Sequence, residues 1–155
     1  MVYPNIPRSE KRRILLQLIL GKIIYNFGIQ LYLLGIRLAS LSNPKAKLWL
    51  HGRRNWREEL SLKVDLKKPR ILFHASSLGE MEQGLPILKQ VREGLPNHQI
   101  VLSFFSPSGY QNFKEKELCD IICYLPADAP KEANDFAKVL KPELALFIKY
   151  DIWPN

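Results

Sequence analysis

The sequence has few cysteines, and this scarcity excludes two kinds of small domain. Cys119 and Cys123 are two cysteines in 155 residues, too few for a disulfide scaffold or for a zinc site with four cysteine ligands. Two isoleucines lie between them, which predicts two reduced thiols in a core. His51 has no His, Cys or Asp partner at ligand spacing. We therefore expect no metal and no other cofactor.

Glycine-rich nucleotide motifs are missing too. The sequence contains no G-x-G-x-x-G after a strand-like segment and no G-x-x-x-x-G-K-[ST], which argues against a dinucleotide site or a P-loop. It also lacks G-x-S-x-G, and no His stands near a loop Ser to suggest a hydrolase triad. Eight glycines and eleven prolines are ordinary for this length, so collagen-like and low-complexity chains are excluded.

Acidic residues are scarce in the first half of the chain. Residues 1–70 hold 15 Lys and Arg against 4 Asp and Glu, whereas residues 71–155 hold 8 against 11. These net charges of +11 and −3 sum to the total of +8. Such asymmetry predicts an anionic partner for the first half, either a lipid surface or a nucleic acid. We favour the lipid surface and expect no nucleic acid, because RNA binding would leave the neighbouring apolar segment without a role.

The first segment, residues 1–42, is apolar but interrupted by charge. Leu, Ile, Tyr and Phe dominate Ile14–Leu41, and the longest run without a formal charge is the 14 residues between Lys22 and Arg37. A spanning helix needs about 20 apolar residues. We therefore favour a membrane-associating helix that lies in the interface behind a basic leader. A spanning signal-anchor and an apolar helix docked on a protein domain stay open as alternatives.

Residues 43–69 are interpreted as a basic connecting segment. Asn43 and Pro44 should end the preceding helix. Lysines and arginines then alternate with Trp49 and Trp56. Tryptophans among cations are typical of a membrane–water boundary, where the rings lie at headgroup level.

From residue 70 to residue 155, short apolar runs alternate with helical periodicity. We predict four strands, at 70–75, 99–105, 120–125 and 144–149. We predict helices at 80–94, just after Gly109, and at 130–140. This alternation is typical of an α/β fold, a Rossmann-like parallel sheet with helices on both faces. Ligands of such sheets bind beyond the carboxyl ends of the strands.

The loop after the first predicted strand has the most chemical promise. Gly79 permits a positive φ or a close backbone approach, and the dipole of the following helix keeps Glu80 anionic. A carboxylate fixed toward a cleft suits a general base, although Glu at an early helical position is ordinarily only a partner of the dipole. By the same reasoning, Ser106 and Ser108 are more often N-caps than ligand contacts. His74 is expected to be a packed core residue.

Five motifs follow one another along the chain. They are HASSLGE at 74–80, LP at 85–86, FSPSGY at 105–110, YLPAD at 124–128 and KYDIWPN at 149–155. In this order they resemble the N-terminal half of the 3-deoxy-D-manno-octulosonic acid (Kdo) transferases of lipopolysaccharide synthesis. The resemblance covers nearly the whole chain, including NPKAK at 43–47 and GRRNW at 52–56.

The resemblance implies an enzyme with two facing Rossmann-like domains, the GT-B arrangement, of which residues 70–155 are the acceptor-side domain. Such an enzyme transfers Kdo from CMP-Kdo to a hydroxyl of the lipid A precursor at the cytoplasmic face of the inner membrane. The Glu of the family's S-x-G-E loop is its proposed general base, and it matches Glu80. The substrate-binding residues are then expected in two loops: Ser76, Ser77, Gly79, Ser106, Ser108 and Gly109.

Two departures from the family pattern bear on mechanism. Many members carry E-x-E-x-W-P after the fourth strand, where this chain has Lys149 and Asp151. Lys149 is then expected to hold a carboxylate or phosphate of a substrate, and Asp151 to take the acidic role. The family's CMP-binding residues lie in a second domain, so we expect the 155 residues to be a fragment or one half of a split enzyme, inactive alone. The competing interpretation is a non-catalytic, membrane-surface glycolipid-binding domain that retains the fold.

Overall fold

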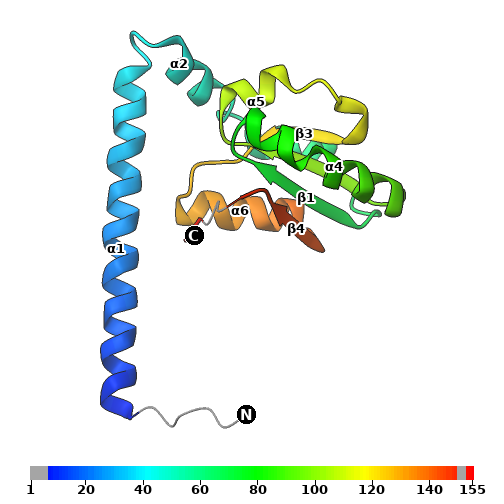
Figure 1. The fold of residues 1–155 in the computed structure, drawn as a ribbon. Coiled ribbons are helices and arrows are strands. Elements are labelled where there is room, and N and C mark those ends of the chain that lie inside the picture. Colours follow the sequence, from blue (N-terminus) through cyan, green and yellow to red (C-terminus); the bar gives the residue numbers. More distant parts are fainter. Residues whose placement is uncertain (1–6, 150–152) are drawn as a thin grey trace.

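The computed structural model describes residues 7–149 and 153–155 of the chain. A long N-terminal helix is followed by two short helices, and then strands alternate with helices (Figure 1). The predicted fold class is confirmed: a Rossmann-like α/β sheet preceded by an apolar helix.

Four parallel strands form the sheet. They are β1 (Arg70–Ala75), β2 (Gln99–Phe104), β3 (Ile121–Tyr124) and β4 (Leu144–Phe147). Their order is β3-β2-β1-β4, so the chain builds outward to β3 and then crosses back to the other side of β1. Along the register, Phe73 lies between Leu102 and Leu146. Every residue of β1 and β2 is buried, as expected for parallel strands covered on both faces.

The ends of the strands differ slightly from the prediction. β1 has the predicted bounds, whereas β2 ends one residue earlier and β4 two residues earlier than predicted. Lys149 has a φ of 66°, a left-handed conformation that cannot continue a strand. β4 is also the last strand in the sheet, and its Leu144 and Phe147 side chains stay 43% and 45% exposed.

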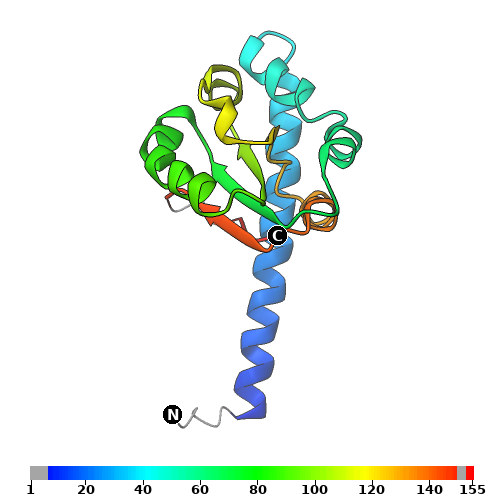
Figure 2. The same ribbon diagram turned by 90° about the vertical axis from the view of Figure 1, so that its right-hand side faces the viewer.

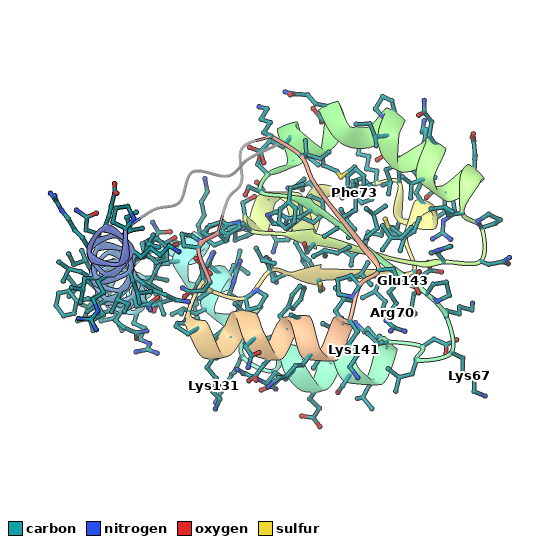
Figure 3. All side chains as sticks on the ribbon, turned by 90° about the horizontal axis from the view of Figure 1, so that it is seen from below. Lys67, Arg70, Phe73, Lys131, Lys141 and Glu143 are labelled. Carbon is teal, nitrogen blue, oxygen red and sulfur yellow. The ribbon has the colours of Figure 1, made fainter. Side chains whose placement is uncertain are left out.

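Helices cover the two faces of the sheet. On one face lie α4 (Leu78–Gly94), α5 (Pro107–Asn112) and the short 3₁₀ helix η1 (Lys116–Leu118), over a cluster that includes Phe73, Met81, Leu88, Leu102 and Phe104. Phe73 points from the sheet toward α4 (Figure 3). On the other face, α6 (Pro130–Leu140) covers a second cluster that includes Leu72, Val101, Phe136 and Leu140.

The basic connecting segment contains two further helices, which the sequence analysis did not predict. These are α2 (Pro44–His51), capped by the Asn43 side chain, and α3 (Trp56–Lys63). Trp49 and Trp56 are 7% and 5% exposed, so their interpretation as headgroup residues is wrong. Trp56 packs on Phe136, 5.6 Å between ring centroids, and α3 joins the core beside α6.

The long helix α1 (Arg8–Ala39) runs past one end of the sheet (Figures 1 and 2). Arg70 and Glu143, which lie at the amino ends of β1 and β4, are at the end of the domain away from α1 (Figure 3). The carboxyl ends of the strands therefore face the helix. The first half of α1 extends beyond the α/β domain (Figure 2).

Candidate functional site

The strand order places a crevice between β1 and β4. The order β3-β2-β1-β4 changes direction between these neighbouring strands: α4 follows β1 on one face of the sheet, and α6 leads into β4 on the other face. Ligands of open parallel sheets bind outside the carboxyl ends of the strands at such a switch point. The two segments beside it are the loop after β1, which carries Ser76, Ser77 and Glu80, and the segment after β4, which carries Lys149.

A capping box fixes Glu80 at the start of α4. The Ser77 side chain accepts a hydrogen bond from the Glu80 amide (3.4 Å), and the Ser77 amide donates to Glu80 Oε2 (3.1 Å). The carboxylate is half-buried, and within residues 7–149 and 153–155 it forms no ion pair. One of its oxygens is thus engaged by backbone, and the other has the lone pairs that a general base needs. The capping box also gives Glu80 the helix-stabilising role that is ordinary for a Glu in the first turn of a helix.

The loops after β1 and β2 are hydrogen-bonded to each other. The Ser106 amide donates to the Ser76 carbonyl at 2.8 Å. The Ser106 side chain accepts from the Gly109 amide and so caps α5, as predicted for a loop Ser, and its Oγ lies 2.9 Å from that of Ser108. The predicted candidates in these two loops are therefore brought together at one end of the sheet.

The two loop glycines differ in what a side chain at their positions would meet. Gly79 has no positive φ, because it lies in the first turn of α4, and a side chain there would meet no atom of residues 7–149 or 153–155 within 4 Å. Gly109 is buried, and a Cβ at that position would overlap the Phe104 ring. Packing alone thus requires a glycine at 109, whereas no described residue crowds position 79.

Lys149 lies on the β4 side of the crevice in a strained backbone conformation. A positive φ in a residue other than glycine costs on the order of 1 kcal/mol and is concentrated at functional sites. The side chain is exposed. Asp151, the other predicted acidic candidate, lies outside the described residues.

A pocket of about 470 Å³ opens next to Lys149. Its walls are mostly apolar and come from β1, β4, α6 and the chain end, with Leu72, Phe136, Phe147 and Trp153 among them. Glu80 is not among its lining residues, because α4 starts on the opposite face of the sheet. The predicted base and this pocket are therefore on the two sides of the switch point.

Arg53 is a structural residue that the sequence analysis assigned to the membrane-facing cations. Its guanidinium donates to the carbonyls of Phe105 (2.7 Å), Leu125 (2.8 Å) and Trp49 (3.2 Å). It also stacks 3.8 Å from the centroid of the Trp49 ring. Burial lowers the pKa of Arg53 to about 9, so it is still charged at neutral pH. It ties together the ends of β2 and β3, which accounts for its burial without any ligand.

Polar contacts from α1 reach the same edge of the sheet, and the sequence analysis missed them. The Tyr25 hydroxyl donates to Asp128 Oδ2 at 2.6 Å, and the Asn155 side chain donates to Asn26 Oδ1 at 2.9 Å. The Asn155 amide and side chain also donate to Asp128. We call these four residues the α1 latch. In the sequence, Asn26 is one polar residue within an apolar run, and nothing around it predicts a contact with Asn155.

The described residues contain no cluster of metal-ligating side chains, and one of their helices is long and apolar. In residues 7–149 and 153–155, no group of three or more His, Cys, Asp and Glu side chains could hold a metal ion. Glu10–Ala39 is long and apolar enough to cross a membrane by length and composition; its most apolar stretch has a mean hydropathy of 1.5 and contains no fully buried residue.

Comparison with known proteins identifies the family. A family model described as 3-deoxy-D-manno-octulosonic-acid transferase (kdotransferase) matches residues 54–155. The chain belongs to the Kdo transferase family. This match begins in the connecting segment and includes the whole sheet and all of the loops described above.

Curated Kdo transferases align with parts of the chain. The one from Aquifex aeolicus is 32% identical over 89 residues, which are 57% of this chain and 24% of the relative. The one from Haemophilus influenzae is 29% identical over 86 residues, 55% of this chain and 20% of the relative. The one from Chlamydophila psittaci is 24% identical over 143 residues, 85% of this chain and 32% of the relative. The chain thus spans about a third or less of the length of these Kdo transferases.

Proposed function

We propose that the chain is the acceptor-side part of a glycosyltransferase that passes Kdo from CMP-Kdo to a hydroxyl of a lipid A precursor. Membership of the Kdo transferase family is the observation that carries this proposal. A second Rossmann-like domain, in the GT-B arrangement, would hold the nucleotide of the donor. The exposed apolar helix and the net charge of +11 in residues 1–70 suit a phosphorylated glycolipid in an anionic membrane. We place the enzyme at the cytoplasmic face of the inner membrane.

Glu80 is the proposed general base. The acceptor hydroxyl gives its proton to the carboxylate oxygen that the Ser77 amide does not engage, while the hydroxyl oxygen attacks the anomeric carbon of Kdo. The bond from that carbon to the phosphate oxygen breaks, and CMP leaves with the electron pair. Because a phosphate is already a stable anion, the leaving group needs no protein acid. The capping box orients the base before substrate arrives, which reduces the cost of positioning it.

The two loops of the crevice provide candidate substrate contacts. Open space above Gly79 admits a close approach by the acceptor sugar. Lys149, on the opposite side, is proposed to bind a carboxylate of Kdo or a phosphate of the acceptor. Asp151 is proposed to take the acidic role that a Glu has in many family members.

A non-catalytic glycolipid-binding domain is the second candidate. The observation in its favour is that the capping box alone explains Glu80, and that the 470 Å³ pocket does not include this residue. Such a domain would bind vesicles that contain the glycolipid, whatever residue stands at position 80.

The substitution Glu80→Gln separates the two candidates. Glutamine also serves at this position of a capping box, so the fold should be unaffected while the base is lost. We expect transfer of labelled Kdo from CMP-Kdo to a lipid A precursor to fall by about 10² to 10⁴-fold. The assay combines residues 1–155 with the C-terminal part of the Aquifex aeolicus relative, which supplies the donor domain.

Glu82→Gln is the matched control, because Glu82 is an exposed acid one half-turn further along α4. It should leave the rate within about twofold, since it removes an exposed charge that points about 200° around the helix from Glu80. Transfer that survives Glu80→Gln would refute the role of this residue. Glycolipid binding without transfer in any combination of halves would favour the non-catalytic domain.

A further inference from the structure

The segments that follow the strands of the sheet are held together by contacts outside the strand ladder. The Ser106 amide donates to the carbonyl of Ser76, the first residue after β1. The Arg53 guanidinium donates to the carbonyl of Phe105, the first residue after β2 (2.7 Å), and to that of Leu125, the first residue after β3 (2.8 Å). One side chain from outside the sheet therefore joins two strand ends directly and reaches a third through the loop after β2.

The segment after β4 reaches the same place through an aromatic contact. The centroid of the Trp153 ring lies 5.0 Å from that of the Phe105 ring. The Arg53 guanidinium lies over the same Phe105 ring, also 5.0 Å from its centroid. It is 4.8 Å from the centroid of the Tyr124 ring and 3.8 Å from that of the Trp49 ring. We call Arg53 and the rings of Trp49, Phe105 and Tyr124 the Arg53 cluster; with the bond between the first two loops, it connects the segments after all four strands.

The end of α2 brings Arg53 to this position. Gly52 is the C-cap of α2, and a Cβ there would overlap the Tyr124 ring, so glycine lets the chain pass this close to β3. The third hydrogen bond of Arg53 goes to the carbonyl of Trp49 (3.2 Å), one of the last carbonyls of α2. Such carbonyls have no partner within their helix. The guanidinium is thus fixed by carbonyls from three separate segments.

The connected segments carry the groups to which the proposed function assigns roles. Ser77, which caps Glu80, is in the loop after β1, and Lys149 is in the segment after β4. The distance between these two sides of the crevice therefore depends on contacts that converge on Arg53. A displacement of about 1 Å in a reacting group can cost about 10²-fold in rate.

We propose that Arg53 is a positioning residue for Kdo transfer, which fixes the segments at the carboxyl end of the sheet and so aligns the two sides of the crevice. This inference rests on the proposed function and adds to it a residue just before the segment that the family model matches. Arg53 acts without touching the substrate, because its guanidinium is engaged by three backbone carbonyls and stacked on aromatic rings.

The substitution Arg53→Lys removes the positioning while keeping the charge. A planar guanidinium donates in several fixed directions and stacks on rings, whereas an ammonium group is a compact point charge. A lysine therefore cannot hold the three carbonyls and stack on Trp49 at the same time. Arg54→Lys is the matched control, because Arg54 is the neighbouring residue, is exposed and is not a member of the Arg53 cluster.

The first test measures whether Arg53→Lys loosens the loops more than the sheet. Hydrogen–deuterium exchange of the 155-residue chain in detergent is followed by mass spectrometry. We expect amide protection of residues 105–110 and 125–129 to fall by about tenfold, and that of residues 100–102 in β2 to fall by a smaller factor. A residue that only stabilises the whole fold would instead act on the core amides, which exchange through global unfolding. Equal losses in loops and sheet, or unchanged loops, would refute the positioning role.

The second test measures transfer of labelled Kdo with the same C-terminal part of the Aquifex aeolicus relative. For Arg53→Lys we expect kcat to fall by about 10- to 100-fold, whereas the KM for CMP-Kdo should not change, because the second domain is proposed to hold the nucleotide. Arg54→Lys should leave kcat within about twofold. Circular dichroism at the assay temperature checks that each variant is folded, so that a lower kcat does not report a smaller folded fraction. If Arg53→Lys does not fold, Arg53→Gln, which buries no charge, takes its place with Arg54→Gln as control.

Failure of this inference is distinct from failure of the proposed function. Transfer that is abolished by Glu80→Gln but unchanged by Arg53→Lys would refute only the positioning role. Equal losses of kcat in Arg53→Lys and Arg54→Lys would also refute it, because Arg54 is outside the cluster. If the unsubstituted chain shows no transfer in any combination of halves, the proposed function is refuted, and with it the role of Arg53 in transfer.

Discussion

Arg70, which is buried, and Arg53, which is half-buried, tie down the two ends of the sheet. At the amino end, Arg70 donates to the carbonyls of Leu140 (2.6 Å) and Lys68 (2.6 Å). At the carboxyl end, Arg53 makes the corresponding contacts with the segments after β2 and β3. Backbone carbonyls just outside strands and at helix ends lack regular partners, and a guanidinium can satisfy several at once. Neither arginine is therefore available to an anionic ligand, although both contribute to the positive charge of the first half.

The two cysteines provide a test of burial at the residue scale. Burial raises the pKa values of Cys119 and Cys123 to about 12. Both side chains are half-buried, so at pH 8 a thiol-specific disulfide reagent should react more slowly with the native chain than with the chain unfolded in guanidinium, because the thiolate is the reactive form. Absorbance of the released chromophore measures both rates. Equal rates would contradict the burial of these thiols.

The same pKa values fix the sign of a pH effect on stability. Both thiols have a folded-state pKa above the value of about 8.5 expected in the unfolded chain. The unfolded chain therefore loses these protons first, and the free energy of unfolding falls as the pH rises from about 9 toward 12. Below about pH 8 the contribution is fully present.

At the scale of elements, the capping box of α4 stabilises the site as well as the helix. Ser77→Ala removes the side chain that accepts from the Glu80 amide. We expect a loss of about 1 kcal/mol in the free energy of unfolding, measured by urea denaturation. Ser61→Ala is a suitable control, because Ser61 is exposed and lies inside α3 rather than at its start. An equal loss in both variants would show that the cap contributes nothing specific.

The sheet could be predicted from sequence because its strands are continuous apolar runs with clear ends. Residues 70–75 and 99–104 are buried on both faces, and such strands differ sharply from the helices between them. The two helices in residues 43–69 could not be predicted from apolar runs. A tryptophan stacked under an arginine inside a protein has the same local sequence as a tryptophan among cations at a membrane surface, and only the tertiary contacts of Arg53 distinguish the two.

The candidate site was predicted in part. Glu80, Ser76 and Ser106 lie at the predicted edge, because the carboxyl ends of parallel strands follow directly from the strand positions. The α1 latch was not predicted, since Tyr25 and Asp128 are 103 residues apart and each is unremarkable in its local sequence. The left-handed conformation of Lys149 has no local signal either, because lysine shows no preference for it.

At the scale of the whole molecule, β4 is the least protected part of the sheet. Nothing pairs with its outer side among the residues that the structure describes, and Leu144 and Phe147 are partly exposed on it. Exposed edges of this kind promote pairing between chains. We expect the 155-residue chain to self-associate as its concentration rises, even in detergent that covers α1.

Leu144→Lys tests this expectation, because a charge on an edge strand discourages pairing. Light scattering should show a smaller mean mass for this variant than for the unsubstituted chain at the same concentration. Leu62→Lys is the control, since Leu62 is 81% exposed but lies on α3, away from the edge. A mean mass lowered equally by both substitutions would point to general charge repulsion instead of edge pairing.

The uncovered strand also matters for how the crevice is completed. One wall of the 470 Å³ pocket belongs to β4 and to the segment that follows it. Any polypeptide that added a fifth strand along this edge would at the same time close the pocket from the side and immobilise Lys149. Under the role proposed for Lys149, binding of an anionic substrate and completion of the sheet would be coupled, and ligand affinity should report on whether the sheet has been extended.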